Sequence, residues 1–381
     1  MFLRRRGFGK SGTCFGASLL AWWEVSILST QTVVVTGASA GAGRAIAHRF
    51  ARAGARVGLI ARDATALDAV ADEVERLGGQ ACPAAADVAD PDALFEAAAR
   101  IRGTLGAADV WVNDAMVTVF APFAALTPEE FRRVTEVTYL GYVHGTMAAL
   151  RQMRPRNKGV IVQVGSALAY RGIPLQSAYC GAKHAIRGFT EAIRTELLHE
   201  RRNIAITMVQ LPAVNTPQFD WARSHMRRLP RPMGLTFQPE VVADAVFHAA
   251  HRPRPEYWLG RTTVLTVLGN MLLPGLLDRI LARTGYRGQE RPLPASPERP
   301  DNLLRPVGPF HRTHGAFDRE AHAHALLVPA TVARLGALAL GSAAILAIGL
   351  AAAKARGRLA RSTEPVDPAG RGTMPTKALF S

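Results

Sequence analysis

Residues 32–43 read TVVVTGASAGAG. The β-branched run Thr32–Thr36 is typical of a buried strand, and a helical pattern follows from Gly43. Glycines at 37, 41 and 43 lie between them with the spacing Gly-x-x-x-Gly-x-Gly. Glycine permits the tight turn and lets the backbone approach a pyrophosphate, which the amides of a helix N-terminus attract. The stretch therefore predicts a strand–loop–helix unit that binds a dinucleotide.

The same alternation of strand and helix continues to about residue 260. Short apolar runs alternate with longer amphipathic segments, and residues 129–153 are expected as one long helix. Such βαβ units require a parallel sheet. We expect an α/β fold, a Rossmann-like doubly wound parallel sheet with helices on both faces, plus a C-terminal extension with a candidate membrane helix.

Composition excludes several classes of protein. The chain has 381 residues, 48% hydrophobic and 20% charged, which rules out wholesale disorder. Its three cysteines exclude a disulfide scaffold. Neither Cys-x-x-Cys nor His-Glu-x-x-His occurs, so no metal site is expected. The net charge is +16, but the basic residues are scattered arginines without a basic stripe, so no nucleic-acid partner is expected.

The composition divides the chain into five parts. We interpret residues 1–31 as an N-terminal extension rather than a signal or anchor, and 32–262 as the catalytic domain. An apolar helical segment is expected over 263–288. The Pro- and Arg-rich stretch 289–330 predicts a linker, with disorder over 285–320 as the other interpretation. Residues 331–381 are expected to form a candidate membrane-associated helix and a basic tail.

Leu335–Ala353 runs for 19 residues without a charge, and basic residues follow it. The length is sufficient for one membrane span. A helix lying in the membrane plane and an Ala-rich helix packed within an oligomer remain alternatives. The catalytic domain is expected to be cytoplasmic.

The second strand ends at Ala61-Arg62. A carboxylate near this point would bind the ribose of NAD, and none is present at 61. A guanidinium suits a 2′-phosphate, so NADP(H) is favoured over NAD(H).

Tyr179 and Lys183 are spaced i, i+4 at the start of a predicted helix, so both side chains emerge on one face. A nearby ammonium lowers the pKa of a phenol, which makes Tyr179 a usable general acid or base. Ser166 follows a predicted strand and could donate to a substrate oxygen.

Taken together, these segments resemble the short-chain dehydrogenase/reductase superfamily over about residues 32–260. TGASAGAG, ADV (86–88), VNDA (112–115), Ser166 and YCGAK occur in the order of that family. The resemblance implies that Lys183 and Tyr179 also contact the nicotinamide ribose, and that the protein is a homo-oligomer. It further implies a set of cofactor-binding residues: Gly37, Ser39, Gly41 and Gly43 at the pyrophosphate, Asp87 and Val88 at the adenine, Asn113 and Ala115 along the channel, and Thr216 at the nicotinamide.

Three segments depart from the family pattern. Asn-Asn-Ala-Gly reads Asn113-Asp114-Ala115-Met116, and Pro-Gly reads Pro212-Ala213. The helical Asn of the family's proton relay corresponds to Thr138, whose hydroxyl has fewer donor and acceptor sites for a water.

The loop 217–237 contains Phe219, Trp221 and Met226, which suit a bulky apolar carbonyl or alcohol. We therefore predict an NADP(H)-dependent reductase or dehydrogenase that uses Ser166, Tyr179 and Lys183. A cofactor-binding scaffold or sensor with weak catalysis is the main alternative. A lipid-modifying isomerase or dehydratase on the same fold is a further one.

Overall fold

The computed structural model describes residues 31–362 apart from 297, 309 and 310. The expectations for residues 1–30 and for the tail beyond 362 lie outside this part of the chain. Contacts divide the chain into two units, residues 1–331 and 332–381, which are described separately below.

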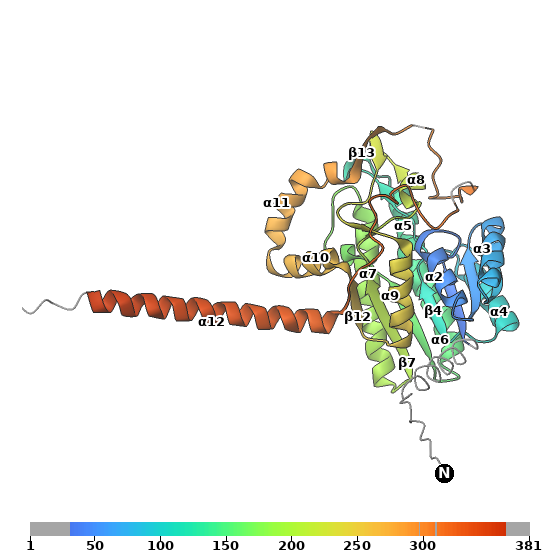
Figure 1. Cartoon of the computed structure of the whole chain (residues 1–381). Helices are drawn as coiled ribbons and strands as arrows, with labels where there is room; N and C mark the ends of the chain where they lie inside the picture. Colours follow the sequence, from blue (N-terminus) through green and yellow to red (C-terminus); the bar gives the residue numbers. More distant parts are fainter. Residues whose placement is uncertain (1–30, 297, 309–310, 363–381) are drawn as a thin grey trace, which may run out of the picture. The chain divides into compact units, whose positions relative to one another are not determined.

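The first unit is built on an eight-stranded sheet with the order β14-β12-β7-β6-β4-β1-β2-β3 (Figure 1). All neighbouring strands are parallel except β14, which pairs antiparallel with β12 at the edge. The order reverses beside β1, because the chain goes from β3 back to β4 on the other side. The strands are β1 (Thr32–Thr36), β2 (Arg56–Ala61), β3 (Gln80–Ala85), β4 (Val110–Asn113), β6 (Gly159–Val164), β7 (Ile204–Gln210), β12 (Glu256–Leu259) and β14 (Leu327–Pro329).

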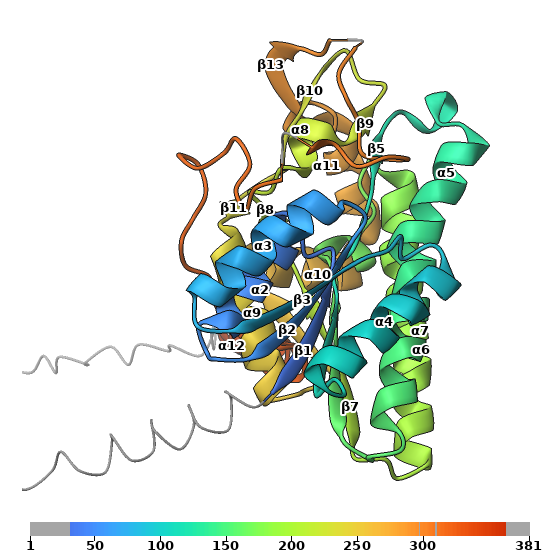
Figure 2. The same ribbon diagram turned by 90° about the vertical axis from the view of Figure 1, so that its right-hand side faces the viewer.

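Helices cover both faces of this sheet (Figure 2). Alternate residues of β1 separate the two layers: Val33 and Val35 lie in one hydrophobic cluster and Val34 in the other. The first cluster includes α2 (Gly41–Ala51), α3 (Ala64–Arg76) and α9 (Pro239–His251). The second includes α4 (Pro91–Leu105), α6 (Gly141–Met153) and α7 (Ser177–His199). The doubly wound parallel sheet predicted from the sequence is therefore present.

The long helix expected over 129–153 is interrupted. It consists of α5 (Pro128–Thr135), a π-helical turn (Glu136–Leu140) and α6. Thr138 lies in the π turn, where its hydroxyl donates to Val117 O at 2.8 Å and accepts from Val117 N at 3.1 Å. A single π turn of this kind is frequent at functional sites.

Two helices follow β12, namely α10 (Gly260–Leu272) and α11 (Pro274–Thr284). They correspond to the apolar segment expected over 263–288. Pro274 begins α11, since proline fits the first turn of a helix and cannot continue the interior of another. We call the pair the α10–α11 hairpin.

The stretch 289–330, expected as a linker, belongs to the first unit and packs against its other elements over the described residues. β13 (Glu290–Pro294) pairs with β10 (Arg228–Pro230), and β14 joins the main sheet. Leu303 and Phe317 are buried. Composition alone does not reveal these contacts, because they join residues far apart in the sequence.

The helix α12 (Ala330–Ser362) supplies the described part of the second unit from Val332 onward. Its segment Ala330–Lys354 has 25 residues and a mean hydropathy of 2.1 in its most apolar window, none of which is buried. By length and composition this segment could cross a membrane.

Candidate active site

A cavity of about 480 Å³ lies at the carboxyl ends of the central strands. Its wall includes the glycine-rich loop after β1, the end of β2, and residues that follow β4, β6 and β7. This edge, beside the reversal of strand order between β1 and β4, is where open α/β sheets bind ligands.

The glycine-rich loop has room for glycine and for little else. Gly37 has φ +74°, and a Cβ there would lie 2.8 Å from Ala115 Cα. A Cβ on Gly43 would lie 2.3 Å from the carbonyl oxygen of Gly37. Gly41 has φ +56°, and a Cβ there would lie 3.1 Å from Thr216 Cγ2. The loop therefore brings bare backbone to the cavity at the start of α2, which is the cradle that a pyrophosphate requires.

Not all residues expected at the cofactor lie on the cavity wall. Gly43 is packed behind Gly37, and Asn113 is fully buried in a polar network outside the cavity. Asn113 accepts from Trp111 Nε1 at 2.9 Å and donates to Gln163 Oε1 at 2.9 Å. Its amide therefore holds β4 to its surroundings rather than facing a ligand. The residues that do line the cavity are Gly37, Ser39, Gly41, Arg62, Asp87, Val88, Ala115, Tyr179, Lys183 and Thr216.

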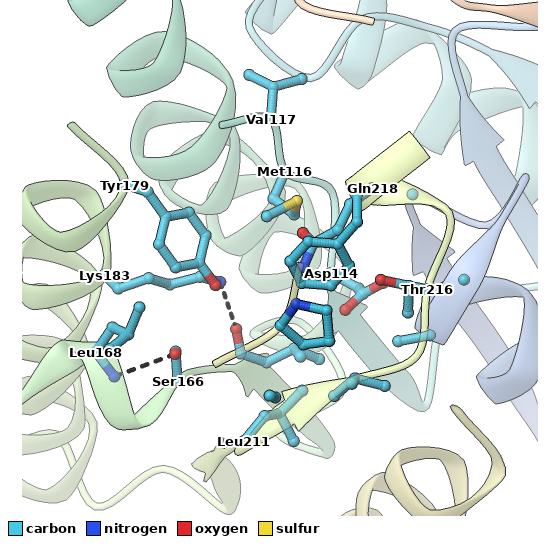
Figure 3. Close-up of a pocket in the computed structure, with 18 of the residues that line it drawn as sticks. Asp114, Met116, Val117, Ser166, Leu168, Tyr179, Lys183, Leu211, Thr216 and Gln218 are labelled. Atoms are coloured by element: carbon cyan, nitrogen blue, oxygen red, sulfur yellow. Dashed lines mark hydrogen bonds between the residues drawn. The ribbon is translucent and has the colours of Figure 1, made fainter. Parts of the chain in front are cut away.

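Ser166, Tyr179 and Lys183 face the same cavity (Figure 3). Ser166 follows β6, and its Oγ accepts from Leu168 N at 3.1 Å, which leaves the hydroxyl hydrogen for another acceptor. Tyr179 and Lys183 lie in the first two turns of α7. The i, i+4 spacing thus brings both side chains to the position predicted for them.

Lys183 is held by groups beneath the cavity. Its Nζ donates to Val164 O at 2.8 Å and to Tyr142 Oη at 3.0 Å. Tyr142 Oη in turn donates to Val164 O at 2.9 Å. This tyrosine, fully buried on α6, was not among the predicted site residues, because no sequence spacing links it to Lys183.

The pKa of Tyr179 is raised in the structure, whereas the sequence predicts that Lys183 lowers it. Its pKa is raised above the usual range, mainly by burial, while the Ser166 hydroxyl lowers it and Asp114 raises it further. The ammonium of Lys183, 5.6 Å from the centre of the Tyr179 ring, does not offset these effects in the described structure. Tyr179 therefore holds its proton, as a general acid does before the reaction.

Asp114 is the buried negative group of the site. Burial raises its pKa, although the Lys183 charge and a hydrogen bond from the Gly43 backbone oppose this. Burial likewise lowers the pKa of Lys183, and Asp114 opposes that shift. Asp114 and Lys183 thus stabilise each other's charged forms. Asp114 stands where the family pattern has its second Asn, so it adds a titratable carboxyl group to the site.

Thr138 lies outside the cavity wall, and Val137 lines the wall instead. The only hydroxyl hydrogen of Thr138 is donated to Val117 O, as described above. The hydroxyl is thus engaged with backbone.

The end of the cavity beside Arg62 is lined by residues of the stretches 301–308 and 311–315, which we call the covering segment. Arg62 donates to Asn302 O at 2.5 Å and to Leu303 O at 3.3 Å. Gly41 N donates to Arg312 O at 3.0 Å. Asp63, next to Arg62, lies 3.0 Å from His311 Nε2. Sequence reasoning did not find this segment, since its composition is that of a linker.

The other end of the cavity is largely apolar. Phe219 lines the cavity, and so does Trp221, whose ring lies beside His311 of the covering segment, whereas Met226 is buried in a neighbouring cluster with Phe120. The α10–α11 hairpin adds side chains that were not predicted, among them Thr262 and Thr263, whose hydroxyl oxygens are buried without a hydrogen-bond partner in the described part of the chain. Unpartnered buried hydroxyls beside a cavity are available to a ligand.

Comparisons with known proteins agree with this geometry. The family model described as short chain dehydrogenase matches residues 31–227, just over half of the chain. The uncharacterized oxidoreductase YxnA of Bacillus subtilis is 33% identical over 272 residues, which cover 71% of this chain and 76% of that protein. Dehydrogenase/reductase SDR family member 7B of Mus musculus is 31% identical over 266 residues, or 67% of this chain and 81% of that protein.

Two solved structures are similar over the same region. An alcohol dehydrogenase from the archaeon Thermococcus sibiricus, complexed with 5-hydroxy-NADP, has a TM-score of 0.50 and 26% identity, and the match covers 57% of this chain and 88% of that one. A short-chain type dehydrogenase/reductase from Mycobacterium marinum has a TM-score of 0.50 and 27% identity, covering 59% and 91%. The chain belongs to the short-chain dehydrogenase/reductase superfamily of oxidoreductases.

Proposed function

We propose that this oxidoreductase interconverts a bulky apolar carbonyl compound and its alcohol, with NADP(H) preferred over NAD(H). One observation carries the proposal: Ser166, Tyr179 and Lys183 line the same cavity as the glycine-rich loop. Hydride transfer needs a nucleotide cradle and a proton donor at one site, and this cavity has both.

The residues present fit a dinucleotide. The loop at Gly37 and Gly41 leaves backbone exposed for the pyrophosphate, and Arg62 lies at the end of β2 where the adenosine ribose would lie. When bound, the nicotinamide supplies or accepts the hydride. Side chains of this chain would orient the substrate, transfer the proton and stabilise the developing charge.

Ser166 would orient the substrate oxygen. Its Oγ accepts from Leu168 N, and its hydroxyl hydrogen, which now faces Tyr179, could be donated to that oxygen. Tyr179 would give its proton to the same oxygen during reduction and take one back during oxidation. Lys183, held by Val164 O and Tyr142 Oη, would keep a positive charge beneath the cavity and favour the phenolate as it forms.

The cofactor preference rests on Arg62 and on the absence of an acid at Ala61. A guanidinium binds a 2′-phosphate through charge-assisted hydrogen bonds. The Thermococcus sibiricus enzyme, similar over the same region, was solved with an NADP derivative. In the described structure Arg62 donates to carbonyls of the covering segment, so a 2′-phosphate would share or replace those contacts.

A cofactor-binding scaffold or sensor with weak catalysis is the second candidate. The engagement of the Thr138 hydroxyl with Val117 favours it, since that hydroxyl is not free to donate to a relay water. The homo-oligomer implied by the family resemblance is a separate proposal, and neither candidate function requires it.

The test is oxidation of NADPH and of NADH by the purified full chain with hydrophobic aldehydes and ketones of increasing chain length. We expect turnover that rises with chain length and a lower KM for NADPH than for NADH. Binding of NADPH without turnover on any substrate of the panel would support the scaffold instead.

A further inference from the structure

The α10–α11 hairpin exposes an apolar face beside the cavity. Leu265, Leu272 and Leu276 are among its exposed large side chains, with Leu272 75% exposed. Figure 1 shows both helices at the flank of the sheet, after β12. Isolated exposed leucines are ordinary on protein surfaces, but several on two consecutive helices indicate an interaction surface.

The opposite side of the hairpin is held to the body by polar contacts. Asn270 Nδ2 donates to Tyr170 O at 2.8 Å, and Arg171 Nη1 donates to Asn270 Oδ1 at 3.2 Å. Arg171 also forms an ion pair with Asp278. The hairpin therefore has a fixed inner side, and Leu265, Leu272 and Leu276 are left exposed.

Ile280 joins this outer face to the cavity. Its side chain is 45% exposed and also lines the cavity wall, together with Leu277, Leu281 and Thr266 of the hairpin. Ser166 and Tyr179 line the same cavity. The apolar end of the site therefore borders the apolar outer face.

Charge on the hairpin indicates which partner covers this face. Residues 260–288 contain four arginines and one aspartate, and that aspartate is paired with Arg171. Arg279 and Arg283 are exposed, and neither has an ion-pair partner among the described residues. Exposed leucines interleaved with free arginines are suited to the interface of a bilayer with anionic headgroups.

The same chain also contains α12, which is long and apolar enough to cross a membrane. A second copy of the chain seated on the hairpin would cover Ile280 and close the edge of the cavity. A bilayer would instead leave that edge open to molecules dissolved in the lipid. Both considerations favour lipid over another protein chain.

We propose that the α10–α11 hairpin docks on a bilayer containing anionic lipid, and that the apolar substrate enters the cavity from the lipid past Ile280. Docking of the hairpin on a bilayer does not require that the protein be active. Entry of the substrate from the lipid rests on the proposed function.

The docking surface is tested with the full chain reconstituted into vesicles of phosphatidylcholine and phosphatidylglycerol. Leu272→Cys carries an environment-sensitive fluorophore, in a Cys14→Ser background, because Cys82 and Cys180 are buried. Leu198→Cys on α7 is the matched control, since Leu198 is 70% exposed and far along the chain from the hairpin. We expect the probe at 272 to shift its emission to the blue and to be quenched by lipids brominated on the acyl chain, while the probe at 198 does neither.

Two results would overturn the docking surface. One is a probe at 272 that stays unquenched, like the probe at 198. The other is a probe at 272 that lipid does not quench and that is covered by a second copy of the chain, as shown by cross-linking between the two copies. The emission shift and the quenching do not require turnover. A protein that is inactive but has a quenched probe at 272 would therefore reject the proposed function and leave the docking surface intact.

The route of entry is tested by the double variant Leu272→Glu/Leu276→Glu against Leu198→Glu. For a long-chain aldehyde supplied in vesicles, we expect the KM of the double variant to rise at least about tenfold, since burying one leucine in hydrocarbon is worth more than that factor. For a short water-soluble aldehyde, kcat/KM should stay unchanged. An unchanged KM for the vesicle-borne aldehyde would reject entry from the lipid.

Discussion

Gly43→Ala tests whether the glycine-rich loop is the cofactor cradle. A Cβ at this position would lie 2.3 Å from Gly37 O, 2.8 Å from Gly37 C and 2.9 Å from Asp114 Oδ2. Ordinary contacts between carbon and a carbonyl oxygen begin near about 3.3 Å, so Gly37 or the start of α2 must move by about 1 Å. Overpacking of this kind costs about 1–3 kcal/mol of stability.

The displacement should weaken cofactor binding more than it disturbs the fold. Gly37 lines the cavity directly, and a misplacement of about 1 Å is enough to lose a factor of roughly 100 in a positioned site. We expect the Kd of NADPH to rise roughly 10- to 100-fold, which corresponds to about 1.4–2.7 kcal/mol. Isothermal titration calorimetry and thermal unfolding measure the two effects on the same sample.

Gly188→Ala on α7 is the matched control, because a Cβ there meets nothing within 4 Å. It should bind NADPH like the wild type and gain up to about 1 kcal/mol in stability, since alanine is the better helix former. Wild-type affinity for NADPH in Gly43→Ala would refute the assignment of this loop.

Three further substitutions test individual contacts. Arg62→Ala should raise the Kd of NADPH by roughly tenfold or more and leave that of NADH nearly unchanged, as measured by titration, because a charge-assisted bond contributes about 1.5–3 kcal/mol; equal losses for both would contradict the preference. Asp114→Asn removes a charge that raises the pKa of Tyr179, so the phenolate should form more readily. The pH profile of alcohol oxidation should then move to lower pH, and a shift to higher pH would count against this. Thr138→Ala leaves buried Val117 backbone groups unpaired and should cost about 1–3 kcal/mol in the free energy of unfolding, whereas Thr138→Ser should cost less; equal stability of the two variants would exclude the contact.

The sheet and the central side chains were predictable from local patterns. Apolar residues indicate strands and helices because the side chains on one face recur at a fixed spacing in each element. The i, i+4 spacing likewise places Tyr179 and Lys183 on one face wherever a helix forms. The glycine spacing predicts the turn after β1 for a similarly local reason.

Features that depend on distant contacts were not predictable in this way. Arg62 bonds to Asn302 across 240 positions of the sequence, and nothing in either neighbourhood indicates the other. The burial of Asn113 and the support of Lys183 by Tyr142 are likewise consequences of packing between elements. The raised pKa of Tyr179 follows from burial, which a spacing argument does not include.

We propose that Tyr179 transfers the proton in an NADP(H)-dependent carbonyl reduction. The most direct measurement compares kcat and the Kd of NADPH for the wild type and Tyr179→Phe on the best aldehyde or ketone of the panel. We expect kcat to fall by about 100-fold or more while the Kd changes little, because the ring remains and only the proton donor is lost. A Tyr179→Phe variant that turns over at the wild-type rate would contradict it.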